Sequence, residues 1–225
     1  MTHLKGLIFD LDGTLTLTQA LHFQIYSEVF KKLGITYTHE EDILQYAGKG
    51  AELTFKGVLA SHQISTTPEE IKKYCQEKRA LYDELIAKTD IPVVPGIREF
   101  LARMKQSGMK MAVASGTQLE AIEVILKKTG MRHYFETIVT SKDVSAPKPS
   151  PEIFLKAAEK LELKPEECVV FEDAANGIQA AKAGHIPCIA LTTGTSKENL
   201  MAAGATLVVK DYTEITDDIL FKIHL

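Results

Sequence analysis

Two aspartates one residue apart, placed directly after a short apolar run, are the feature that most restricts what this chain can fold into. Residues 7–9 predict a buried strand, because the run is too short for a helix and a turn signal follows it. Asp10 ends that strand and Asp12 follows two positions later, so their side chains point to one face about 7 Å apart. Gly13 permits a sharp turn, which lets both carboxylates face one pocket.

Two carboxylates this close are unfavourable unless a cation or a shared proton compensates them. A bound divalent metal would supply the cation, and an acid–base role for one aspartate would supply the proton. The alternative is an acidic turn that closes an ordinary strand. Motifs elsewhere in the chain are needed to distinguish a metal-binding site from such a turn.

Length and charge exclude several classes of protein. The 225 residues are enough for one large domain or for one domain with an inserted module. A net charge of −4 offers no basic surface to nucleic acid, and no apolar stretch approaches the length of a membrane span. We therefore expect neither a nucleic-acid nor a membrane partner, and an anionic substrate would need a locally built site.

The cysteines indicate a reducing compartment. Cys75, Cys168 and Cys188 are odd in number and scattered, which suggests neither a disulfide framework nor a zinc site. The N-terminus carries no signal-peptide pattern ahead of Asp10. We expect reduced core thiols in a cytoplasmic protein.

The chain divides into a helical segment and an alternating segment. Apolar residues at helical spacing predict helices over residues 19–33, 40–46, 52–60 and 68–88. Beyond residue 91, helices predicted over 97–106, 118–128, 151–161, 174–183 and 197–202 alternate with strands over 109–114, 137–140, 168–171, 187–191 and 205–209. This alternation predicts an α/β protein: a Rossmann-like parallel-sheet core of residues 1–16 and 92–225, with an all-helical module of residues 17–91 inserted after the first strand.

Polar residues follow several of the predicted strands. Ser115 and Gly116 come after the strand over 109–114, Lys148 lies in the loop after 137–140, and Glu172 and Asp173 come directly after 168–171. In open parallel sheets, ligands bind beyond the carboxyl ends of the strands. Together with the two aspartates of the first strand, these groups suit a metal-bound phosphate.

These positions resemble the four motifs of the haloacid dehalogenase (HAD) superfamily. The segment over residues 10–14 resembles the first motif, Ser115 the hydroxyl of the second, and Lys148 the lysine of the third. Glu172 and Asp173, with Gly177, resemble the acidic fourth motif. The resemblance covers essentially the whole chain and implies the HAD fold with a helical cap domain.

Each of these residues also has a structural interpretation. Ser115 could cap the following helix, and Lys148 could be a solvated loop charge. Glu172 and Asp173 could be surface charges at a helix start, where they suit the helix dipole. Their position directly after a buried strand favours a site over a surface.

The resemblance implies a reaction in two steps. Asp10 would be the nucleophile that forms an aspartyl-phosphate, and Asp12 the general acid for the leaving alcohol and then the general base for water. Ser115 and Lys148, with the backbone N–H of Gly116, would bind the phosphoryl oxygens. ATPases of the superfamily carry threonine in place of Asp12, so this aspartate favours the phosphatase and phosphomutase branch.

The resemblance also implies a Mg²⁺ cofactor. Asp10, the backbone carbonyl of Asp12, and Asp173 would hold it, with Glu172 acting directly or through water. Oxygen ligands of this kind are those that Mg²⁺ prefers.

Substrate choice is expected to lie in the cap, which resembles that of the β-phosphoglucomutase-like subfamily. Thr18 and His22 stand where relatives have a hydroxyl and a histidine facing the cleft, although His22 could equally be structural. Lys78 falls on an apolar helical stripe, so it either extends to solvent or faces the cleft. Ala51 replaces an arginine that the mutases use for a second phosphate, and Lys49 could compensate for it.

We therefore expect a Mg²⁺-dependent phosphatase that acts on a small phosphorylated metabolite, a sugar or polyol phosphate, as a monomer or weak homodimer. A β-phosphoglucomutase-like phosphomutase is the alternative, and Ala51 argues against it. A non-enzymatic binding protein is a third possibility, but none of the four motifs lacks its key residue.

Overall fold

The computed structural model describes residues 4–46 and 50–223. Contacts within the chain divide it into two compact units, Met1–Leu17 with Ile91–Leu225 and Thr18–Asp90. Among the described helices, none combines the length and the apolar content that crossing a membrane requires.

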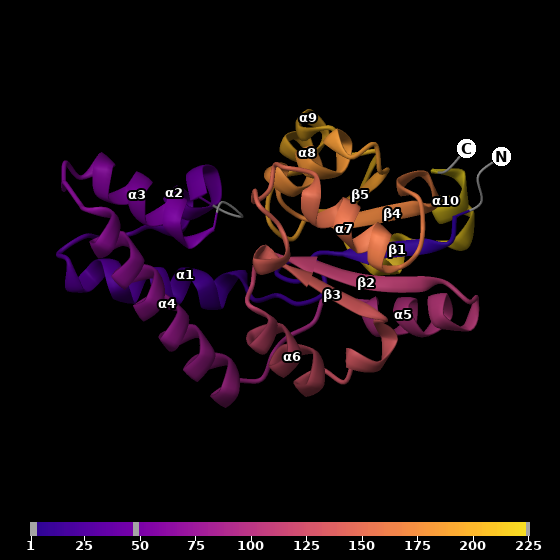
Figure 1. The fold of residues 1–225 in the computed structure, drawn as a ribbon, viewed down its shortest axis with the longest axis horizontal. Coiled ribbons are helices and arrows are strands. Elements are labelled where there is room, and N and C mark those ends of the chain that lie inside the picture. Colours follow the sequence, from indigo (N-terminus) through magenta and orange to yellow (C-terminus); the bar gives the residue numbers. More distant parts are fainter. Residues whose placement is uncertain (1–3, 47–49, 224–225) are drawn as a thin grey trace. The chain divides into compact units, whose positions relative to one another are not determined.

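The first unit is built on a six-stranded sheet with the strand order β3-β2-β1-β4-β5-β6. All neighbouring strands are parallel, which confirms the predicted α/β class (Figure 1). The strands are β1 (Gly6–Phe9), β2 (Lys110–Ser115), β3 (Thr137–Thr140), β4 (Cys168–Glu172), β5 (Cys188–Leu191) and β6 (Leu207–Val209). The strand order changes direction beside β1, between β1 and β4, and this switch point is where open α/β sheets bind ligands.

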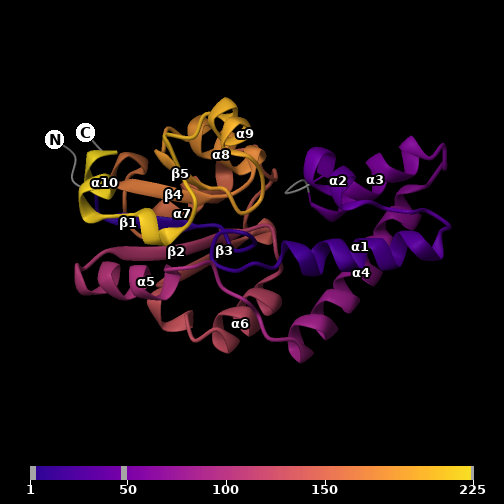
Figure 2. The same ribbon diagram turned by 180° about the vertical axis from the view of Figure 1, so that it is seen from behind.

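Helices cover both faces of this sheet. Figure 2 shows α7, α8 and α9 on one face and α5 and α6 on the other. The helices of this unit are α5 (Ile97–Gln106), α6 (Leu119–Lys128), α7 (Glu152–Lys160), α8 (Ala175–Ala183), α9 (Lys197–Ala203) and α10 (Asp217–Lys222). The sequence predicted all of these except α10, whose six residues are too few to show a helical period.

Aromatic side chains pack beneath the centre of the sheet. The ring of Phe9 stacks on that of Phe171 at 4.7 Å between centroids. Phe100 of α5 lies edge-on to both rings, and Tyr212 lies 5.1 Å from Phe100. Because Phe9 and Phe171 immediately precede Asp10 and Glu172, this ring cluster fixes the strands at the point where the acidic residues begin.

The second unit contains helices joined by loops and, among its described residues, no strand. It consists of α1 (Gln19–Lys32), α2 (His39–Glu41), the π-helical turn η1 (Asp42–Tyr46), α3 (Ala51–Ser61) and α4 (Pro68–Lys88). The single helix predicted over 40–46 is thus a short α-helix followed by a wider turn. A capping box between Thr67 and Glu70, with Pro68 at the first helical position, starts α4 where the sequence predicted.

The two segments of the first unit that lead toward the helical unit pair with each other. The Leu17 N–H donates to the carbonyl of Pro92 at 2.8 Å, and the Val94 N–H donates to that of Leu15 at 3.2 Å. Thr16 and Val93 form an antiparallel bridge between these bonds. The two segments that connect the sheet-bearing unit to the helical unit therefore form one short two-stranded ribbon.

We expect Phe100→Ala to lower the free energy of unfolding by about 3–5 kcal/mol, because it removes a buried ring that contacts three others. Urea denaturation followed by circular dichroism measures this. Met201→Ala on α9, at a residue that is 49% exposed, is the control and should change stability by about 0.5 kcal/mol or less. A loss below about 1 kcal/mol for Phe100→Ala would show that the ring cluster does not support the sheet.

Candidate active site

The strand register brings the first and fourth motifs together. Phe9 of β1 pairs with Phe171 of β4, so the residues that follow them, Asp10 and Glu172, are neighbours across the sheet. The Asp10 N–H continues the ladder by donating to the Phe171 carbonyl at 3.0 Å. Ser115 is the last residue of β2, on the other side of β1. The polar groups therefore gather at the carboxyl ends of three adjacent strands.

Lys148 joins two of these groups. Its Nζ donates to Oδ1 of Asp10 at 2.6 Å, to Oε1 of Glu172 at 2.6 Å, and to the carbonyl of Ala114 at 3.3 Å. These three acceptors match the three donors of an ammonium group. The lysine side chain is only 11% exposed and lies over the ring of Phe154, so it is not a solvated loop charge.

Burial and charge act against each other in this cluster. Burial raises the pKa of Asp10 to about 7, although the neighbouring Lys148 lowers it, and Glu172 and Asp12 raise it further. Burial alone would lower the pKa of Lys148, but the Asp10 and Glu172 carboxylates outweigh that effect and raise it. The lysine thus stays protonated, and additional positive charge at the site would favour ionised Asp10.

Backbone groups hold Glu172 in place. Its Oε2 accepts from the N–H groups of Asp173 and Ala174, both at 2.9 Å. A Cβ added to Gly177 on α8 would lie 1.8 Å from Glu172 Oε1, so only glycine leaves room for the carboxylate. This contact explains why the fourth motif has glycine at position 177.

Asp173 is enclosed in a similar way. It is 4% exposed, and a Cβ added to Gly194, in the segment after β5, would lie 2.3 Å from its Oδ2. The hydroxyl of Thr193 donates to the carbonyl of Gly13 in the turn of the first motif. One loop therefore contacts both acidic segments of the site, and sequence reasoning did not assign it a role.

Thr117 is a polar contact of the site that the sequence analysis missed. Its hydroxyl donates to Oδ2 of Asp12 at 2.7 Å, and its N–H donates to Oγ of Ser115 at 3.1 Å. Gln118 occupies the N-cap position of α6, so Ser115 serves the turn rather than the helix. The available signal was a second hydroxyl residue, Thr117, two positions after Ser115.

The donor set suits a hard divalent cation. Asp10 and Asp173 are buried carboxylates, and carboxylate and carbonyl oxygens are the ligands that Mg²⁺ prefers, together with water. Within residues 4–46 and 50–223, no three His, Cys, Asp or Glu side chains form a group that could hold a metal ion. Both oxygens of Glu172 accept hydrogen bonds, Oε1 from Lys148 and Oε2 from two backbone amides, whereas Lys148 contacts only Oδ1 of Asp10. Asp10 and Asp173 are therefore the carboxylates that we expect to hold the ion, and the ligand assignment stays a prediction.

In the helical unit, the structure brings two of the predicted substrate-binding residues together. Nζ of Lys78 on α4 lies 2.8 Å from Nδ1 of His22 on α1. The His22 ring stacks on Tyr82 at 4.3 Å between centroids. The Lys78 ammonium lies 4.9 Å from the centroid of the Tyr82 ring and 5.3 Å from that of Tyr26. A half-buried lysine on an apolar stripe thus packs among aromatic rings.

Thr18 and Lys49 are the other two predicted substrate-binding residues of this unit. Thr18 is fully buried at the N-cap of α1, and its carbonyl accepts from the His22 N–H at 3.1 Å. Lys49 lies outside the described residues.

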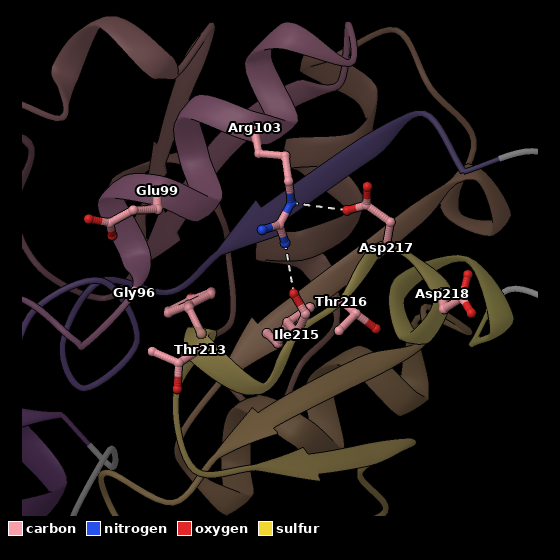
Figure 3. Close-up of a pocket in the computed structure, with 9 residues that line it drawn as sticks. Gly96, Glu99, Arg103, Thr213, Ile215, Thr216, Asp217 and Asp218 are labelled. Atoms are coloured by element: carbon pink, nitrogen blue, oxygen red, sulfur yellow. Dashed lines mark hydrogen bonds and ion pairs between the residues drawn. The ribbon is translucent and has the colours of Figure 1, made fainter.

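A separate cavity of about 750 Å³ lies along α5 and the segment after β6 (Figure 3). It contains none of the predicted site residues. The Arg103 guanidinium lines this cavity. It pairs with the Asp217 carboxylate at 3.0 Å and donates to the Ile215 carbonyl at 2.7 Å. The chemistry-bearing groups at the strand ends, rather than this cavity, form the candidate active site.

Gly177→Ala should displace the Glu172 carboxylate and lower the free energy of unfolding by about 1–3 kcal/mol, as overpacking does. The sign is informative, because alanine for glycine inside a helix otherwise stabilises by up to about 1 kcal/mol. Urea denaturation measures it. Gly116→Ala is the control, since its Cβ meets nothing within 4 Å, and it should stay within about 1 kcal/mol of the parent. A stabilised Gly177→Ala protein would contradict the close contact.

Comparison with known proteins agrees with this geometry. The Haloacid dehalogenase-like hydrolase family matches residues 7–191. A phosphorylated carbohydrates phosphatase of Thermotoga maritima is 34% identical over 215 residues, which cover 92% of this chain and 94% of that protein. The fructose-1-phosphate phosphatase YqaB of Escherichia coli is 30% identical over 82% of this chain and 94% of its own.

Solved structures give the same result. The crystal structure of β-phosphoglucomutase from Clostridium difficile superposes with a TM-score of 0.84 at 26% identity, over 98% of this chain and 97% of that one. These matches confirm the resemblance inferred from the four motifs. The chain belongs to the haloacid dehalogenase-like hydrolases, as an enzyme of their phosphatase type.

Proposed function

We propose that this protein is a Mg²⁺-dependent phosphatase that hydrolyses small sugar or polyol phosphates through an aspartyl-phosphate on Asp10. The observation that carries the proposal is the Lys148 bridge to Asp10 and Glu172, with Nζ 2.6 Å from each carboxylate. It leaves a carboxylate nucleophile buried beside a fixed ammonium, which is the arrangement that phosphoryl transfer needs.

The proposed reaction assigns one role to each core residue. An Asp10 oxygen bonds to phosphorus as the bond to the leaving alcohol breaks, and Asp12 gives that alcohol its proton. Asp12 then takes a proton from the water that attacks the aspartyl-phosphate and releases inorganic phosphate. Lys148 and Ser115 hold the phosphoryl oxygens, and Thr117 holds the Asp12 carboxylate through its 2.7 Å bond.

The metal would add charge to the same site. Asp10, Asp173 and the Asp12 carbonyl are the groups we propose to hold Mg²⁺, with Glu172 acting through water, and bound Mg²⁺ neutralises phosphoryl charge.

The sugar-phosphate class rests on the relatives and on the helical unit. Two relatives at 30–34% identity are named as phosphatases of phosphorylated carbohydrates and of fructose 1-phosphate. We propose that residues 17–91 act as a cap domain that selects the substrate, with Thr18, His22, Lys49 and Lys78 as its binding residues. The ammonium and imidazole that meet at 2.8 Å offer a hydrogen-bonding pair for substrate oxygens.

A phosphomutase is the second candidate, favoured by the structural similarity to β-phosphoglucomutase. Ala51, at the first position of α3, argues against it, because the resemblance to the mutases implies an arginine at this position for the second phosphate. A mutase must keep its bisphosphate intermediate bound while the intermediate reorients in the site. Holding its second phosphate needs a second cationic contact.

The test is phosphate release, with and without Mg²⁺, across a panel of phosphorylated sugars, polyols, nucleotides and short acids that includes β-glucose 1-phosphate. Strong metal-dependent release from sugar or polyol phosphates supports the proposal. Conversion of β-glucose 1-phosphate to glucose 6-phosphate after priming with bisphosphate, without phosphate release, would move the protein to the mutases. Inactivity in both assays would favour a binding protein.

Asp10→Asn should reduce kcat by roughly 10⁴-fold or more, because an amide oxygen is a poor nucleophile and a poor metal ligand. Circular dichroism should show an unchanged fold, since the substitution keeps the side-chain shape. A variant that retains activity within about tenfold of the parent would rule out Asp10 as nucleophile.

Lys78→Met should lower kcat/KM for the best sugar phosphate by about 10- to 100-fold, while changing hydrolysis of p-nitrophenyl phosphate by less than about threefold. The ratio of the two losses is the measurement. Lys73→Met, at an exposed lysine of the same helix, should alter neither substrate. Equal losses on both substrates would argue against a role for Lys78 in specificity.

A further inference from the structure

Glu152, the first residue of α7, closes the loop that carries Lys148. Its Oε2 accepts from the N–H of Ser145 at 2.7 Å and from the N–H of Ala146 at 3.4 Å. The hydroxyl of Ser145 donates to both carboxylate oxygens at 2.9 Å. On the other side of the lysine, the hydroxyl of Ser150 donates to Oε1 at 3.3 Å.

These bonds connect the two ends of the loop through one carboxylate. Ser145 and Ala146 precede Lys148, and Ser150 follows it, so the lysine lies inside a ring closed by Glu152. The Ser150 N–H also donates to the Pro147 carbonyl at 2.9 Å. Two residues along α7, Phe154 places its ring 4.8 Å from the Lys148 ammonium. One turn of helix thus contacts both the backbone and the side chain of the lysine segment.

The bonding is strong for a partly exposed group. The N–H and hydroxyl of Ser145 hold the pKa of Glu152 below its usual range, so the carboxylate is ionised and its hydrogen bonds are charge-assisted.

We propose that Glu152 is a positioning residue for Lys148: it fixes the loop so that the ammonium reaches the phosphoryl group bound at Asp10. This inference rests on the proposed function, in which Lys148 binds phosphoryl oxygens. It assigns Glu152 no contact with substrate.

An acidic residue at a helix start also stabilises a helix through its dipole, so a loss of thermal stability alone would not distinguish the two roles. Positioning makes a separate prediction. If Glu152 acts only through Lys148, its removal has no further effect on phosphate binding once the lysine is gone.

The experiment is a double-mutant cycle with inorganic phosphate as the probe, measured by isothermal titration calorimetry in the presence of MgCl₂. The variants are E152Q, K148M and the double variant, and melting temperatures are recorded for each. E159Q, on the exposed side of the same helix, is the matched control and should leave phosphate affinity unchanged. If E152Q does not fold, S150A, which removes one of the loop bonds, takes its place in the cycle.

We expect K148M to raise the dissociation constant of phosphate by about 10- to 100-fold, and E152Q to raise it by about 5- to 10-fold. In the K148M background, E152Q should change it by less than about twofold. An equal effect of E152Q in both backgrounds, or no effect in the parent, would overturn the positioning role. An unchanged affinity in K148M would instead refute the role of Lys148 in the proposed function, which is a different failure.

Discussion

The bridge from Lys148 to Asp10 and Glu172 is the interaction on which the rest of the site depends. Removing two carboxylates from water beside each other is strongly unfavourable unless a cation pairs with both. The strand register makes the two carboxylates neighbours. The loop before α7 supplies the Lys148 ammonium, which lies 2.6 Å from each of them. The fold thus brings together three charges that none of their local segments could hold alone.

Close packing, rather than further charge, keeps this arrangement in place. Gly177 and Gly194 let α8 and the loop after β5 approach the Glu172 and Asp173 carboxylates more closely than any side chain would permit. The Phe9 and Phe171 rings anchor the strands one residue before the acidic groups. A rigid scaffold of this kind means that little reorganisation is needed as charge moves during reaction.

Most of the fold and the core of the site could be predicted from the sequence, because both depend on local signals. Short apolar runs and helical periodicity predicted the parallel sheet. Polar residues at the strand ends predicted that Asp10, Lys148 and Glu172 lie at one edge of it. The contacts of Thr117 with Asp12 and of His22 with Lys78 depend on tertiary packing between segments 105 and 56 residues apart, which no local pattern encodes. The turn at Asp42–Tyr46 and the short helix α10 carry too few residues to show a period.

The Asp10 carboxylate, held by Lys148, is the group that we propose accepts the phosphoryl group. Borohydride reduces an acyl phosphate to an alcohol, so quenching the enzyme with borohydride during turnover of its best substrate converts a phosphorylated aspartate into homoserine. Tandem mass spectrometry of the digested protein locates the change. We expect homoserine at position 10 in the enzyme during turnover and none in substrate-free protein. Homoserine at another position, or an unmodified Asp10 in an enzyme that is turning over, would rule out Asp10 as the phosphoryl acceptor.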